Sequence, residues 1–173
     1  MQVDGLRLHP GPPPRVRVFA TSDLHVTLAF LGSVEESDAR SAWDRIGELA
    51  SFQPVTGSFR GVEPLGHPGK PSALCAMVDA GREPLAEMIS EARGPLLTEA
   101  GAPEDTRPPL PHMTLARIQR RAKAIERRQA LRWAHTIDLR GVTFTAASVA
   151  LYTWADDRQE RLFQIVEGHV LGS

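Results

Sequence analysis

Cysteine is almost absent from this sequence of 173 residues, since Cys75 is its only thiol. The chain can therefore form no internal disulfide and no thiolate metal cluster. No run approaches the roughly 20 apolar residues of a membrane span, and the N-terminus shows no apolar signal-peptide core. We therefore expect a cytoplasmic protein that does not bind membranes.

Several catalytic signatures are also missing. There is no HExxH pair, no Walker A lysine loop and no Gly-x-Ser-x-Gly elbow, which removes the commonest metalloprotease, nucleotide-triphosphatase and serine-hydrolase patterns. The composition is otherwise that of an ordinary globular protein, with 42% hydrophobic and 24% charged residues. At this length we expect one domain, residues 1–173, in which residues 1–14 form a loose arm because Pro12, Pro13 and Pro14 exclude a helix there.

The formal net charge is −1, but the charges are unevenly distributed. Residues 1–106 carry 9 basic and 15 acidic side chains, whereas residues 107–173 carry 11 basic and 6 acidic ones. The basic excess is concentrated between Arg117 and Arg132. Such an asymmetry points weakly to an anionic ligand, and a solvated helix face is the alternative interpretation.

The spacing of apolar residues predicts helices interspersed with strands, which is typical of an α+β fold. Strands are expected over residues 15–19, 24–31, 55–62, 72–79, 112–118, 136–139, 148–154 and 162–166. Helices are expected over residues 35–50 and 121–131, and from residue 84 to a kink or end at Gly94-Pro95 near Arg93, with a further turn through Glu99 as the alternative. The segments 63–71 and 102–111 are rich in glycine or proline and are expected to be loops.

Two nearly identical pentapeptides stand 87 residues apart. They are His25-Val26-Thr27-Leu28-Ala29 and His112-Met113-Thr114-Leu115-Ala116. Side chains at alternate positions of a strand share one face, so each motif would present an imidazole beside a hydroxyl, opposite an apolar face. A repeat maintained only by core packing would preserve apolar positions, whereas here the polar positions are preserved as well. The repeat predicts two similar halves whose polar faces meet across one cleft.

Two imidazoles and two hydroxyls around one point suit in-line displacement at phosphorus. One histidine can remove a proton from the incoming oxygen while the other protonates the leaving oxygen. Hydroxyl groups can hold the non-bridging phosphate oxygens. This chemistry requires neither a metal nor another cofactor, and we expect none.

The two motifs resemble those of the two-histidine (2H) phosphoesterase superfamily. Residues 25–32 and 111–117 resemble the bacterial and archaeal RNA 2′,3′-cyclic phosphodiesterases, also called 2′-5′ RNA ligases, and residues 148–152 resemble their C-terminal strand. The resemblance implies a bilobal, pseudo-twofold α+β fold in which two antiparallel sheets line a central cleft and helices lie outside. The lobes would be roughly residues 15–110 and 111–173, intertwined. The resemblance also implies that the protein hydrolyses RNA 2′,3′-cyclic phosphate ends to 2′-phosphates. Some relatives also carry out ATP-independent 2′-5′ ligation.

By the same resemblance, His25 and His112 are the catalytic acid–base pair, with His25 favoured as the acid. Thr27 and Thr114 would bind the phosphate. The family pattern also places Arg117 near the substrate, but strict alternation puts it on the face of Met113 and Leu115. Arg117 is therefore substrate-binding if the strand ends or bulges there, and structural otherwise.

One departure from the family pattern concerns the first lobe. Family members usually have a strand and a helix ahead of the first motif, whereas only 24 residues precede His25 here. The first lobe is therefore expected to lack that N-terminal strand and helix and to expose a sheet edge. We expect a monomer, with dimerisation through that edge as the alternative. The expected partners are RNA ends or nucleotides with a cyclic phosphate. Two alternative functions remain: a phosphoesterase whose substrates are small cyclic nucleotides, and a non-catalytic module that binds RNA or nucleotides.

Overall fold

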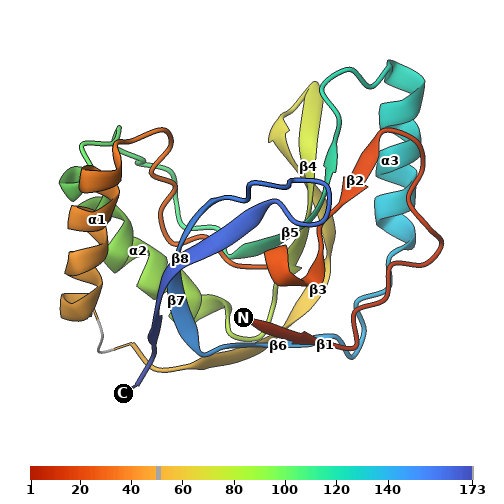
Figure 1. The fold of residues 1–173 in the computed structure, drawn as a ribbon. Helices are drawn as coiled ribbons and strands as arrows, with labels where there is room; N and C mark the ends of the chain where they lie inside the picture. The colour runs from red at the N-terminus through yellow and green to blue at the C-terminus, as the bar shows by residue number, and fades with distance from the viewer. Residues whose placement is uncertain (50–51, 173) are drawn as a thin grey trace.

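The computed structural model describes residues 1–49 and 52–172 and contains two antiparallel sheets, with helices outside them (Figure 1). The larger sheet has the strand order β1-β6-β3-β4-β5-β2, and the smaller one pairs β7 with β8. The strands are β1 (Gln2–Asp4), β2 (Val16–Val18), β3 (Val55–His67), β4 (Lys70–Val78), β5 (His112–Ile118), β6 (Thr143–Ala146), β7 (Ser148–Trp154) and β8 (Phe163–Val170). The predicted α+β class with two antiparallel sheets is confirmed.

Three α-helices flank the sheets. They are α1 (Glu36–Asp44), which continues as the 3₁₀ segment η2 (Arg45–Leu49), α2 (Arg82–Glu99) and α3 (Ala124–Thr136). In Figure 1, α1 and α2 lie together at one end of the molecule, α3 lies at the other end, and β7–β8 runs between them. Within the described part of the chain, no helix is long and apolar enough to cross a membrane.

Strand β4 is buried on both faces because it occupies the middle of the large sheet. Its alternate residues Leu74, Ala76 and Val78 belong to the main core, together with residues of α3 and β5. The intervening Ala73, Cys75 and Met77 form a separate small cluster on the opposite face. This near-continuous apolar run is the pattern expected of a strand covered on both sides.

Several boundary predictions were wrong for identifiable reasons. The segment 24–31 forms no continuous strand and contributes one isolated β-bridge, and residues 137–139 are irregular, while the short β6 was not foreseen. The expected loop at 63–71 is mostly strand, because a bulge at Gly66, with φ of 116°, lets β3 and β4 remain paired up to a tight turn.

The helix boundaries differ in part from those expected. Helix α2 continues through Pro95 to Glu99, the longer of the two ends considered, since Leu96 is buried against α1 and holds the last turns in place. Helix α3 begins later than expected, at Ala124, where the Glu126 carboxylate accepts the backbone N–H of Lys123 at 2.6 Å. The helix expected over residues 35–50 breaks into α1 and η2, and residue 50 lies outside the described residues.

The N-terminal segment is docked rather than loose, which corrects the expectation for residues 1–14. Strand β1 pairs antiparallel with β6, and Leu6 and Leu8 pack against the main core. The indole N–H of Trp133 on α3 donates to the carbonyl oxygen of Pro10 at 2.6 Å. This docking could not be predicted, because a three-residue strand has too short a sequence pattern to recognise.

Asp23 ties the first motif to the small sheet. It lies in the 3₁₀ turn η1 (Thr21–Asp23) and is only 1% exposed. Its two carboxylate oxygens accept the backbone N–H groups of Leu162, at 2.7 Å, and Phe163, at 3.1 Å. A single buried side chain therefore links the turn before His25 to the start of β8.

Replacing Asp23 should destabilise the protein markedly. We expect Asp23→Ala to lower the free energy of unfolding by about 2–3 kcal/mol, because two backbone donors lose a charged acceptor in a buried place. Urea denaturation measures this loss. Asp157→Ala is the matched control, because Asp157 accepts only the N–H of nearby Gln159 on the surface, and it should cost less than about 0.5 kcal/mol. Equal losses in the two variants would contradict this account of Asp23.

Candidate active site

The two repeated motifs meet at their second residues. Val26 forms an isolated antiparallel β-bridge with Met113 on β5. Both side chains belong to the main core, so the flanking polar residues of each motif point to the opposite side. This one backbone contact places the two motifs, 87 residues apart in the sequence, side by side.

Their arrangement follows from this bridge. In an antiparallel pair centred on Val26 and Met113, His25 stands opposite Thr114, and Thr27 stands opposite His112. The two histidines are then diagonal neighbours, separated by about 7–8 Å at their backbones. That spacing leaves room for a phosphorus centre with one imidazole on each side.

Both histidines are oriented by the same hydrogen bond. The ring Nδ1 of His25 lies 2.7 Å from the carbonyl oxygen of Asp23, and the Nδ1 of His112 lies 2.6 Å from that of Leu110. A carbonyl oxygen only accepts, so Nδ1 carries the proton in each ring. The Nε2 atom of each histidine is left to accept or donate a proton.

The two imidazoles differ in their surroundings. The His25 ring stacks on Tyr152 of β7, with 5.1 Å between centroids, and meets the ring of Phe163 of β8 edge-on at 5.4 Å. This burial lowers the pKa of His25 below its usual 6.5, although the carbonyl and carboxylate of Asp23 oppose the shift. Among the described residues, no comparable pair of aromatic rings encloses His112. The lowered pKa of His25 favours the neutral form of its ring.

The two threonines have unequal exposure. Thr27 is exposed, whereas Thr114 is half-buried, with its hydroxyl 3.5 Å from the thiol of Cys75 on β4. Burial raises the pKa of Cys75, which is 0% exposed. Cys75 therefore lies as a neutral thiol beneath Thr114.

A bulge in β5 determines where Arg117 lies. Thr114 pairs with Cys75, but Ala116 pairs with Leu74, so Leu115 is an extra residue on β5. Beyond the bulge, Arg117 pairs with Ala73, which shares a face with Cys75, and is exposed while Ala116 and Ile118 are buried. Of the two alternatives considered from the sequence, the strand bulges, and Arg117 returns to the face of His112 and Thr114.

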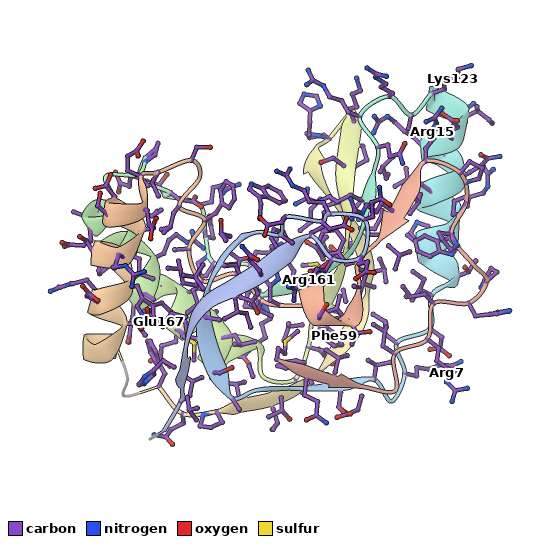
Figure 2. All side chains as sticks on the ribbon, in the orientation of Figure 1. Arg7, Arg15, Phe59, Lys123, Arg161 and Glu167 are labelled. Atoms are coloured by element: carbon purple, nitrogen blue, oxygen red, sulfur yellow. The ribbon has the colours of Figure 1, made fainter. Side chains whose placement is uncertain are left out.

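The rest of the basic run lies elsewhere. Helix α3 packs its Ala130 and Trp133 against the main core, on the face of the sheet opposite Thr114 and Arg117. Arg127 is tied to backbone carbonyls, including that of Pro71 at 2.9 Å. Figure 2 shows Arg15 and Lys123 together at the α3 end of the molecule and Glu167 near α1 at the other end.

Sequence reasoning missed the long-range contacts around His25. Nothing in the local pattern predicted that Tyr152 stacks on His25. Arg17 of β2, which pairs with Arg117, donates to the carbonyl oxygen of Arg158 in the β7–β8 loop. Phe30, which would share the apolar face of Val26 and Leu28 in a regular strand, is 79% exposed, because the backbone after Thr27 bends and ends the alternation.

His25 lies where the first motif meets β5 of the large sheet and the rings of Tyr152 and Phe163 of the small sheet. A hollow of about 400 Å³ lies between α2 and the segment of residues 102–109 that follows it, and its lining includes Arg93, Asp105 and Arg107. Within residues 1–49 and 52–172, no group of three or more histidine, cysteine, aspartate or glutamate side chains could hold a metal ion.

Comparisons with solved structures identify the fold. The structure of E. coli LigT complexed with 3′-AMP is similar with a TM-score of 0.65 and 19% identity, covering 94% of this chain and 85% of that one. TT0787 of Thermus thermophilus is similar with a TM-score of 0.61 and 22% identity, covering 91% of this chain and 83% of that one. These likenesses define a LigT-like two-histidine phosphoesterase fold.

A sequence comparison identifies the family. The model of the 2′-5′ RNA ligase superfamily matches residues 1–158, and the chain belongs to this family. It is also 30% identical to an RNA 2′,3′-cyclic phosphodiesterase of Bacillus subtilis (strain 168) over 96 residues. That match spans 55% of this chain and 51% of the relative, so the chain matches about half the length of this curated protein.

The aromatic enclosure of His25 predicts its titration. We expect His25 to titrate below 6.5 by NMR, and Tyr152→Ala to move its pKa upward, because water then reaches the ring. Tyr152→Phe, which keeps the ring, should leave the pKa low. Below pH 6.5 the unfolded chain then binds more protons than the folded one, so the free energy of unfolding should fall as the pH decreases through that range. A His25 pKa of 6.5 or higher in the unaltered protein would contradict the assignment.

Proposed function

We propose that the protein hydrolyses 2′,3′-cyclic phosphates at RNA ends to 2′-phosphates, using His25 and His112 as an acid–base pair. The observation that carries the proposal is the symmetric geometry of the two motifs: each imidazole has its Nδ1 proton held by a backbone carbonyl, which frees Nε2 for proton transfer. The curated relative, named as an RNA 2′,3′-cyclic phosphodiesterase, supports this substrate class. So does the presence of 3′-AMP in the LigT structure.

The reaction needs one neutral and one protonated histidine. The neutral histidine removes a proton from water through Nε2 as the water oxygen attacks phosphorus. The P–O3′ bond breaks, and the protonated histidine gives its Nε2 proton to O3′, leaving a 2′-phosphate and a free 3′-hydroxyl. Exchange of protons with solvent restores both rings.

The proposed roles of the two histidines are set by their surroundings. The lowered pKa of His25 supports a neutral ring there, and hence His25 as the base and His112 as the acid. This is the reverse of the assignment that the family resemblance favours. Thr27 and Thr114 would donate hydroxyl protons to the non-bridging oxygens, and Arg117 would offset their charge as it grows in the transition state. If a ribose 5′-hydroxyl attacked the cyclic phosphate in place of water, the P–O3′ bond would break in the same way and a 2′-5′ linkage would form without ATP.

A small cyclic nucleotide is the second candidate substrate. The observation in its favour is the position of α3, whose basic side chains lie behind the sheet and away from the histidines. The dependence of KM on salt separates the two: a polynucleotide gives a steep dependence and a mononucleotide a shallow one.

The histidine pair should be essential for turnover without metal. In excess chelator, we expect the protein to convert a short RNA with a 2′,3′-cyclic phosphate end to the 2′-phosphate. His25→Ala and His112→Ala should each lower kcat/KM by about 10²–10⁴, and the double variant by little more than either. His135→Ala on the exposed end of α3 is the matched control and should leave the rate unchanged. Absence of turnover by the folded, unaltered protein would overturn the proposal.

A sulfur-substituted substrate should distinguish the acid from the base. When sulfur replaces O3′, the leaving thiolate needs little protonation, so loss of the acid should matter less. We expect the rate defect of His112→Ala to shrink strongly on this substrate, whereas that of His25→Ala should persist. The opposite pattern, with rescue of His25→Ala alone, would reverse the two roles.

A further inference from the structure

Two arginines stand directly opposite each other at the edge of the large sheet. Arg17 of β2 pairs with Arg117 of β5, and β2 is the last strand on that side of the sheet. The neighbours of Arg17 on β2, Val16 and Val18, pack against the main core, so Arg17 faces the other side of the sheet. The bulge in β5 returns Arg117 to that same side, together with Thr114. Both guanidinium groups therefore belong to the face of the sheet that carries the second motif.

The charges of this pair are arranged to attract an anion. Like charges directly opposite each other in a β-ladder destabilise it. Among the described residues, neither Arg17 nor Arg117 forms an ion pair with a carboxylate, although the β7–β8 loop contains Asp156, Asp157 and Glu160. An anion between the two guanidinium groups removes their repulsion, and phosphate oxygens match the planar set of N–H donors that each group offers.

The guanidinium of Arg17 is held in place before any anion binds. It donates to the backbone carbonyl oxygen of Arg158 in the β7–β8 loop, which reaches β2 in Figure 1, and Arg17 is half-buried. A guanidinium carries more N–H donors than this one bond uses, so the others are available to a ligand. Because the long side chain is already ordered, less conformational entropy is lost when it binds an anion.

Arg17 lies further from the histidines than Arg117 does. On β5, Arg117 is the third residue after Thr114, and Arg17 is one strand further out, about 5 Å away at its backbone. Nothing in the sheet lies beyond β2, so this position is at the outer border of the site. A ligand whose first phosphate lies at the histidines therefore meets Arg17 with a second phosphate, further along the same molecule.

We infer that Arg17 binds a second phosphate, the one on O5′ of the nucleotide whose cyclic phosphate lies between His25 and His112. The inference rests on the proposed function, because it takes the position of the cyclic phosphate from that proposal. In an RNA end, the O5′ phosphate is the last internucleotide linkage. Arg17 thereby favours RNA ends over cyclic nucleotides that have a free 5′-hydroxyl, a distinction that the basic side chains of α3, behind the sheet, do not make.

The experiment compares substrates with and without a phosphate on O5′. They are adenosine 2′,3′-cyclic phosphate, its 5′-phosphorylated form, and the dinucleotide ApA with a 2′,3′-cyclic phosphate end. For the unaltered protein at low salt, we expect both substrates with an O5′ phosphate to have a KM about tenfold below that of the first, because each gains charge-assisted hydrogen bonds. In Arg17→Gln the ratio of these KM values should fall to about one, and in Arg17→Lys, which keeps the charge but not the planar donors, to an intermediate value.

Two comparisons isolate the guanidinium from other effects. Arg128→Gln removes the same charge from the exposed surface of α3 and should leave the ratio of KM values unchanged. If Arg17 serves only to anchor the β7–β8 loop through Arg158, Arg17→Gln should raise the KM of all three substrates by the same factor. That result would overturn the inference.

The outcomes separate this inference from the proposed function. Equal KM values for the three substrates in the unaltered protein, or an advantage that survives in a folded Arg17→Gln variant, would overturn the inference and leave the hydrolysis proposal standing. An advantage confined to the dinucleotide would show recognition of the second nucleoside and would also overturn it. If no substrate is turned over, the proposed function fails, and calorimetry with adenosine 2′-monophosphate and adenosine 2′,5′-bisphosphate tests the second phosphate site by itself; equal affinities would overturn it.

Discussion

The antiparallel contact between Val26 and Met113 is the constraint on which the rest of the site depends. Side chains alternate about an extended backbone, so one such contact decides the direction of every neighbouring residue in both motifs. Because the two apolar side chains face the core, their polar neighbours must face outward together. The stability of the core thus fixes the relative position of the reactive groups, and no direct interaction between the two histidines is required.

The sequence was sufficient for the parts of this arrangement that depend on local alternation. The repeat of histidine and threonine at alternate positions predicted four site residues, and the segment 72–79 was predicted as a strand, which the structure shows as β4. The bend after Thr27 and the position of the bulge at Leu115 could not be predicted from the sequence. Both interrupt the alternation of side chains along the strand because of packing against distant parts of the chain. The stacking of Tyr152 on His25 depends on how a hairpin folds back from a distant part of the chain, and the short β1 and β6 are too brief to leave a pattern.

The two halves of the site are alike in backbone geometry and unlike in environment. Each histidine hydrogen-bonds to the carbonyl two residues before it, yet only His25 is enclosed by aromatic rings among the described residues. A repeated motif by itself would give two equivalent imidazoles, whereas acid–base catalysis requires one to give a proton while the other takes one. The small sheet supplies the difference, since Tyr152 and Phe163 both come from it, and Asp23 anchors that sheet to the turn before His25.

The use of main-chain carbonyls to hold both imidazoles affects how the site responds to mutation. A side-chain partner can be lost through a single substitution, but the carbonyl groups of Asp23 and Leu110 are present whatever residue occupies those positions. Their directions are set by the backbone: Leu110 precedes Pro111, which confines it to extended conformations, and Asp23 closes a 3₁₀ turn. The tautomers of the two histidines are therefore insensitive to most point mutations around them, and a scan of side chains would not reveal the groups that determine them.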